Sequence, residues 1–148
     1  MSLWKPVSKN LRAEVYWAAG EARLQEAEHL LVDFPSGAVY LAGYLVECHL
    51  KWALCRREGV DYLHDLSEPG LADRLTSGRG HDVETLCEVA GYDVHIGRNE
   101  SVRRAFQVAS WWNPGLRYRA DFAQAREAVK FLAAVRVLRD DIRVWANV

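Results

Sequence analysis

One continuous stretch of helical periodicity, residues 36–57, constrains the fold more than any other part of the chain. Apolar residues recur along it at steps of four, three, four and three: Leu41, Leu45, Cys48, Trp52 and Cys55. A helix turns by about 100° per residue, so these side chains share one face. A second set follows the same spacing on an adjacent arc: Tyr40, Tyr44, Glu47 and Lys51. The sequence therefore predicts a long helix that packs by one face and carries polar groups along its flank.

Gly43 and the Glu47–Lys51 pair lead to further expectations within this helix. Because glycine has no Cβ, Gly43 predicts that another helix approaches closely there. Glu47 and Lys51 are four residues apart, and that spacing leaves two interpretations open. They form either an exposed ion pair that stabilises the helix by a few tenths of a kcal/mol, or a partly buried pair with a functional role. The exposed pair is the commoner arrangement.

Two more long helices are expected, over residues 8–32 and about 120–145, because apolar residues recur there at the same spacing. The turn over residues 34–37 is short, so the first helix and the 36–57 helix should form an antiparallel hairpin. No stretch alternates between apolar and polar residues with the period of two that a half-buried strand requires.

Shorter helices are expected at residues 83–90 and 99–110, whereas glycine and proline interrupt most of residues 58–80. The sequence thus predicts a single all-α domain over residues 1–148. Its expected architecture is an up-down antiparallel bundle of three long helices, with short helices inserted before the last one.

Composition limits the classes of protein that the chain can belong to. With 148 residues, 50% hydrophobic residues and a net charge of −1, it is typical of a globular domain and has no overall basic field to attract nucleic acid. Its three cysteines lack the CxxC spacing, so we expect free thiols in a reducing compartment. No apolar run approaches the length of about 18 residues that a membrane span needs. We expect a cytoplasmic protein that does not enter a membrane.

Two His–Asp dipeptides, His64-Asp65 and His81-Asp82, stand in or beside the interrupted region. Adjacent His and Asp can bind one metal ion when the fold supplies further ligands, here His49 upstream and Asp121 or Asp140 downstream. The simpler interpretation is that Asp82 caps the helix that follows. We favour the simpler interpretation and predict neither a metal site nor a cofactor.

Arg74 and His81 form another pair of candidates, with six residues between them. An arginine and a histidine near one phosphodiester can stabilise the developing negative charge and transfer a proton, respectively. Such a pair would cleave RNA without a metal ion. These are the only candidates for catalysis, and they lie in a glycine-rich segment whose spacing says little about geometry.

Residues 111–119 (WWNPGLRYR) combine three aromatic residues with Arg117 and Arg119, just before the last long helix. Arginines near a helix N-terminus favour phosphate binding, and a neighbouring tyrosine or tryptophan can stack on a base. The alternative is a packed loop whose arginines pair with carboxylates such as Glu47 or Asp121. Both interpretations are open.

Three segments, taken in order, resemble the HEPN family of small helical bundles. Residues 38–54 (AVYLAGYLVECHLKWAL) are similar to that family's second helix, with a tyrosine, a glycine, and a glutamate and lysine four apart. Residues 81–92 (HDVETLCEVAGY) are similar to its His-Asp-Leu segment at the start of the third helix. Residues 116–122 (LRYRADF) are similar to its Arg-Tyr segment before the last helix.

The resemblance implies a helical homodimer that acts with a nucleotidyltransferase or another toxin–antitoxin or defence partner. Some family members are metal-independent ribonucleases with a histidine four to six residues after an arginine at the last helix. Here no histidine follows Arg117 or Arg119. The resemblance therefore points to a nucleotide- or RNA-phosphate-binding pocket, with these expected contacts: Tyr44, Glu47, Lys51, His81, Asp82, Arg117, Tyr118 and Arg119.

Three functions remain open at this stage. The first is a nucleotide- or RNA-binding module without catalysis, which the missing histidine favours. The second is a metal-independent ribonuclease that uses Arg74 and His81. The third is a helical adaptor that only binds other proteins.

Overall fold

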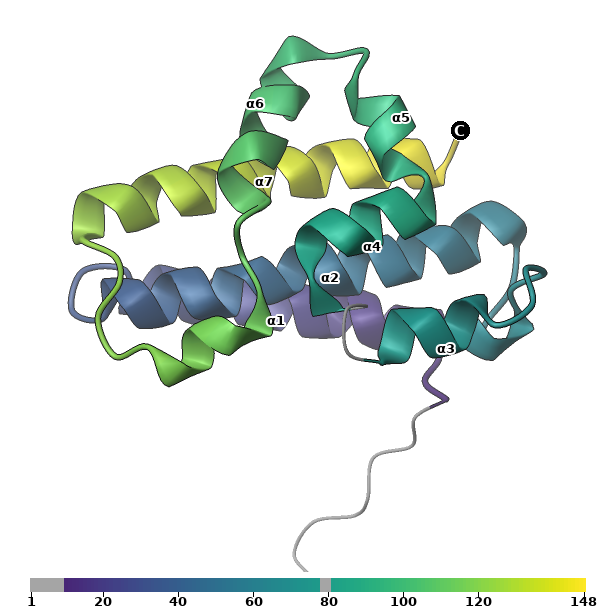
Figure 1. The fold of residues 1–148 in the computed structure, drawn as a ribbon, viewed down its shortest axis with the longest axis horizontal. Helices are drawn as coiled ribbons and strands as arrows, with labels where there is room; N and C mark the ends of the chain where they lie inside the picture. Colours follow the sequence, from purple (N-terminus) through teal and green to yellow (C-terminus); the bar gives the residue numbers. More distant parts are fainter. Residues whose placement is uncertain (1–9, 78–80) are drawn as a thin grey trace, which may run out of the picture.

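The computed structural model describes residues 10–77 and 81–148, and within these ranges the chain is all-α. The regular elements described in these ranges are, in order, α1 (Ala13–Leu30), α2 (Pro35–Glu58), the 3-10 turn η1 (Leu63–Asp65), α3 (Leu71–Thr76), α4 (Val83–Ala90), α5 (Tyr92–Ile96), α6 (Glu100–Ala109), the 3-10 turn η3 (Pro114–Tyr118) and α7 (Ala125–Ala146). The predicted all-α class is confirmed, and the three long helices α1, α2 and α7 pack together (Figure 1).

The long helices do not all alternate in direction. Helices α1 and α2 form the predicted antiparallel hairpin, but α7 runs in the same direction as α2 (Figure 1). At one end Ser36 Oγ accepts hydrogen bonds from the backbone N–H groups of Phe122 and Ala123. At the other end Arg57 donates to the carbonyl oxygen of Trp145 at 2.6 Å. The chain between α2 and α7 thus returns to the end of the bundle where α2 began.

Local sequence explains most helix ends. Pro35 occupies the first turn of α2, where its missing N–H costs nothing, and Gly59 ends that helix with a φ of 70°. Asn99 caps α6 by accepting from the backbone N–H of Val102 at 3.2 Å. Asp82 lies at the N-cap position of α4, but its carboxylate accepts from the Thr85 hydroxyl and makes no cap bond to the backbone. The expected cap by Asp82 is therefore not formed.

Helix α2 is the centre of the core, since it packs against α1, α7 and α4. The predicted apolar face is only partly correct. Leu45 and Cys55 are buried, whereas Leu41, Cys48 and Trp52 are half-buried. Because α2 has neighbours on several sides, more of its surface is buried than the single apolar face that the spacing predicts. Its other buried residues include Ala38, Ala42, Val46, Leu50 and Ala53.

Gly43 is a point of close approach, as predicted, but a side chain and not a helix lies against it. The fully buried indole of Trp112 packs there, and a Cβ built at Gly43 would lie 2.2 Å from it. Trp112 Nε1 also donates to the carbonyl oxygen of Tyr40 at 3.0 Å. Glycine at position 43 therefore allows the segment after α6 to fold onto α2.

The cysteines are unpaired in the structure, as the sequence analysis expects. Cys48, Cys55 and Cys87 are all free thiols. Burial raises the pKa of Cys55 to about 11, which makes its thiolate scarce at neutral pH. None of the helices in the described ranges has both the length and the apolar content to cross a membrane.

Candidate functional site

Glu47 and Lys51 form a buried ion pair on α2. Lys51 Nζ donates to Glu47 Oε1 at 2.8 Å, and the two residues are only 3% and 5% exposed. The commoner, exposed arrangement is therefore not the one observed. Charged groups are rarely buried unless they are paired, because removing them from water is costly. Glu47 and Lys51 meet this condition because each is the other's charged partner.

His81 brings a third titratable group to this pair from the start of α4. Its Nδ1 lies 2.5 Å from Glu47 Oε1, the oxygen that also accepts from Lys51. An ionised carboxylate only accepts hydrogen bonds, so we assign the proton of this bond to His81 Nδ1. The second carboxylate oxygen, Glu47 Oε2, is buried and has no hydrogen-bond partner among residues 10–77 and 81–148.

Glu47 and His81 line a cavity of about 670 Å³. It lies between α2, the start of α4 and the segment around η3, and its lining residues are Tyr44, Glu47, His81, Asp82, Asn113, Pro114, Gly115 and Arg117. Most of the expected nucleotide contacts thus line one cavity, although they come from three distant parts of the sequence. Lys51 is not among the lining residues and supports the site through Glu47.

Tyr44 forms part of the cavity wall and belongs to an aromatic cluster. Its hydroxyl is 2.9 Å from that of Tyr40, and its ring meets Trp112 edge-on with centroids 4.8 Å apart. Burial is the main cause that raises the pKa of Tyr44 above its usual range, and the hydrogen bond with Tyr40 raises it further. The phenol therefore stays neutral and can donate or accept a hydrogen bond.

Arg117 is an exposed cation at the same cavity. Its guanidinium carbon lies 4.9 Å from the centroid of the Tyr118 ring, and the hydrogen bond with Tyr118 raises the pKa of Arg117. Within the described part of the chain, neither Arg117 nor Arg119 forms an ion pair with a carboxylate. The pairing with Glu47 or Asp121 that the alternative of a packed loop requires is thus not observed, and both guanidinium groups are available to an anion.

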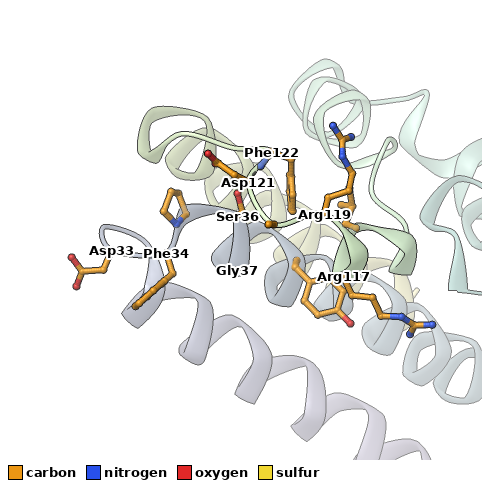
Figure 2. A pocket seen from close by; sticks show the side chains of 12 residues that line it. Asp33, Phe34, Ser36, Gly37, Arg117, Arg119, Asp121 and Phe122 are labelled. Atoms are coloured by element: carbon orange, nitrogen blue, oxygen red, sulfur yellow. Dashed lines mark hydrogen bonds between the residues drawn. The ribbon is translucent and has the colours of Figure 1, made fainter.

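Arg119 and Arg117 both line a second, smaller cavity of about 420 Å³ near the start of α2. Figure 2 shows its guanidinium and that of Arg117 extending in different directions, both away from Ser36. Tyr118, also an expected contact, is 79% exposed and lines neither cavity. Arg117 therefore borders both cavities, whereas Arg119 borders the smaller one and not the larger.

Two other candidates, Arg74 and His49, do not line the larger cavity. Arg74 on α3 pairs with Glu68 at 2.7 Å and does not line that cavity, whereas His81 does. His49 is buried between α1 and α2, where it stacks on Trp17 with ring centroids 3.9 Å apart. Among the described residues, no three His, Cys, Asp or Glu side chains are grouped so that they could hold a metal ion.

Sequence reasoning missed the wall that Asn113, Pro114 and Gly115 contribute. The Asn-Pro-Gly run indicates a turn, and the structure contains one: Asn113 Oδ1 accepts from the backbone N–H of Gly115 at 2.9 Å. That signal locates a turn but not the cavity beneath it. The unpartnered oxygen of Glu47 has no sequence signal at all.

Comparisons of this chain with protein-family models, with curated proteins and with solved structures found no match. In the described ranges the fold and the site together define an all-α protein with a cavity at the flank of its central helix, lined in part by charged residues.

Proposed function

We propose that this protein is a nucleotide- or RNA-phosphate-binding module of the HEPN type, and that the cavity between Glu47 and Arg117 is its binding site. One observation supports the proposal most strongly. The same cavity is lined by Arg117, which has no carboxylate partner in the described ranges, and by Glu47, whose buried Oε2 lacks a donor there. A ligand with both an anionic group and a hydrogen-bond donor satisfies the two together.

A phosphate is the anion that suits Arg117. The guanidinium offers a planar set of donors that matches phosphate oxygens, and charge-assisted hydrogen bonds of this kind are about twice as strong as neutral ones. His81 adds a second polar group, because its Nε2 is not involved in the bond to Glu47. Tyr44 in the wall and the exposed ring of Tyr118 beside Arg117 are available to stack on a base.

The partners belong to the same proposal. The resemblance of the three sequence segments to HEPN proteins supports a homodimer that acts with a nucleotidyltransferase or another toxin–antitoxin or defence protein. Exposed aromatic residues, among them Trp111 and Tyr118, are typical of surfaces that bind other proteins. In this proposal the cytoplasm is the site of action, where nucleotides and RNA are abundant.

Thermal unfolding in the presence of ligands tests the proposal. We would titrate the four ribonucleoside 5′-monophosphates and a mixed-sequence RNA against wild type, Arg117→Ala and the control Arg103→Ala. Arg103 is exposed on α6 and does not line the cavity. At least one ligand should raise the melting temperature of wild type and of Arg103→Ala. Arg117→Ala should bind that ligand about tenfold more weakly or worse. If none of these ligands stabilises wild type, the proposal is wrong.

The bond between His81 and Glu47 supports one alternative, a metal-independent ribonuclease. A carboxylate that holds Nδ1 orients the imidazole and leaves Nε2 to transfer a proton. Arg117, and not Arg74, would then stabilise the developing charge, because only Arg117 lines the cavity. RNA incubated with excess EDTA distinguishes the two functions. Cleavage that is lost in His81→Ala and retained in Arg74→Ala would identify the enzyme, whereas intact RNA supports the binding module.

A further inference from the structure

The two carboxylate oxygens of Glu47 are in different states. Oε1 is saturated, since it accepts from both Lys51 Nζ and His81 Nδ1. Oε2 has no partner in the described ranges and is out of contact with solvent, while Glu47 lines the 670 Å³ cavity, so a donor from the cavity reaches Oε2 by a shift of this wall. A buried acceptor without a donor is costly, so a ligand that supplies one donor at this position gains affinity.

The charges around Glu47 restrict what kind of donor fits. Lys51 already neutralises the carboxylate inside the protein, where both groups are almost fully buried. A ligand ammonium would bring a second full positive charge to the same carboxylate, with Arg117 at the same cavity. Like charges repel more strongly in a partly buried site than in water. A neutral O–H or N–H donor avoids that repulsion and still pairs with Oε2.

We propose that Glu47 determines the specificity of the cavity: Oε2 accepts one hydrogen bond from a neutral donor of a bound nucleotide whose phosphate contacts Arg117. The donor is either a ribose hydroxyl or an exocyclic amine of the base. Because only one oxygen is available, the paired N–H donors on the edge of guanine gain no special advantage. This inference rests on the proposed nucleotide-binding function and adds the part of the ligand that the buried carboxylate recognises.

Ligand variants that lack one donor test the inference on the wild-type protein. A 2′-deoxy and a 3′-deoxy nucleotide each lack one ribose hydroxyl. The exocyclic amine is removed without adding a ring N–H in purine riboside 5′-monophosphate as the analogue of AMP, in 2-pyrimidinone riboside 5′-monophosphate as that of CMP, and in IMP as that of GMP. We would measure each parent and its counterparts by isothermal titration calorimetry. Loss of the donor that Oε2 accepts should weaken binding by about tenfold or more, because the carboxylate oxygen is left unpaired.

Glu47→Gln provides the matched protein variant. Lys51 Nζ donates at the position of Oε1, so the glutamine should place its amide oxygen there and present its NH₂ group to the cavity. The substitution therefore turns an acceptor into a donor without changing the shape of the side chain. In this variant the parent nucleotide should lose its advantage, and parent and donor-lacking analogue should bind within about threefold of each other.

The possible results are separable. If a parent nucleotide binds wild type but neither the deoxy nor the amine-lacking analogue binds more weakly, the inference is wrong and the proposed function stands. If the preference exists but persists unchanged in Glu47→Gln, another group recognises the donor and the inference is again wrong. If no nucleotide binds, both the inference and the proposed function fail. Should Glu47→Gln not fold, the ligand series on wild type still decides the question.

Discussion

Lys51 donates to Glu47 at 2.8 Å in the interior of the protein, and His81 donates to the same carboxylate from a segment more than thirty residues away. This arrangement connects the central helix to the wall of the cavity. It also makes Glu47 sensitive to the loss of either donor.

Lys51→Met should destabilise the fold by about 3–5 kcal/mol, because it leaves the buried Glu47 carboxylate without its counter-ion. Urea unfolding at neutral pH measures the free energy. The double variant Lys51→Met with Glu47→Leu removes both charges and should recover part of the loss. A single variant within about 0.5 kcal/mol of wild type would show that the pair is solvated and not buried.

Gly43→Ala should destabilise the protein by about 1–3 kcal/mol, since the added methyl group would overlap the buried indole of Trp112. Gly37→Ala is a matched control on the same helix, because the nearest atom to its Cβ would be 3.7 Å away. That control should be neutral or stabilising by up to about 1 kcal/mol, through helix propensity. Equal melting temperatures for the two variants would contradict the contact between Gly43 and Trp112.

Trp112→Ala should cost about 3–5 kcal/mol, and Trp52→Ala clearly less. Both tryptophans are candidates for the core by composition, but Trp112 is fully buried whereas Trp52 is half-buried and tilted against Trp17. Denaturant titration of the two variants gives the comparison. A larger loss for Trp52→Ala would mean that the segment after α6 does not pack as described.

The difference between these tryptophans illustrates what periodicity can and cannot predict. Spacing along α2 correctly located a helix and the polar flank with Tyr44 and Glu47, because both depend on local geometry. It could not predict how many neighbours cover the helix. An i,i+4 pair has the same spacing whether solvent or protein covers it, and here the cover comes from His81 and from the segment around Asn113.

The direction of α7 was unpredictable for a related reason. An up-down bundle is the simplest packing when connections are short. The connection between α2 and α7 is long, so the chain can start α7 at either end of the bundle. The bonds from Ser36 Oγ to the N–H groups of Phe122 and Ala123 fix the choice, and such long-range contacts leave no trace in local periodicity.

Stability should fall as pH is lowered from about 6.5 towards 4 because of His49. Burial lowers the pKa of His49 to about 4 in the folded protein, whereas the unfolded chain keeps a value near 6.5. The unfolded state therefore binds more protons in this window, and folding loses about 2 kcal/mol between pH 7 and pH 5 from this group. Urea unfolding of wild type and His49→Phe at both pH values checks it. An identical pH dependence in the variant would contradict the assignment.

The most direct test of the binding cavity is to follow the backbone amide resonances of the ¹⁵N-labelled protein by NMR during titration with the tightest-binding ribonucleotide. Our account predicts that the largest shifts occur at Glu47, Asp82 and Gly115, which line the 670 Å³ cavity and not the smaller one. Shifts confined to residues around Ser36 and Arg119 would place the ligand in the smaller cavity instead and would contradict the account. The absence of any shift at millimolar nucleotide would contradict nucleotide binding itself.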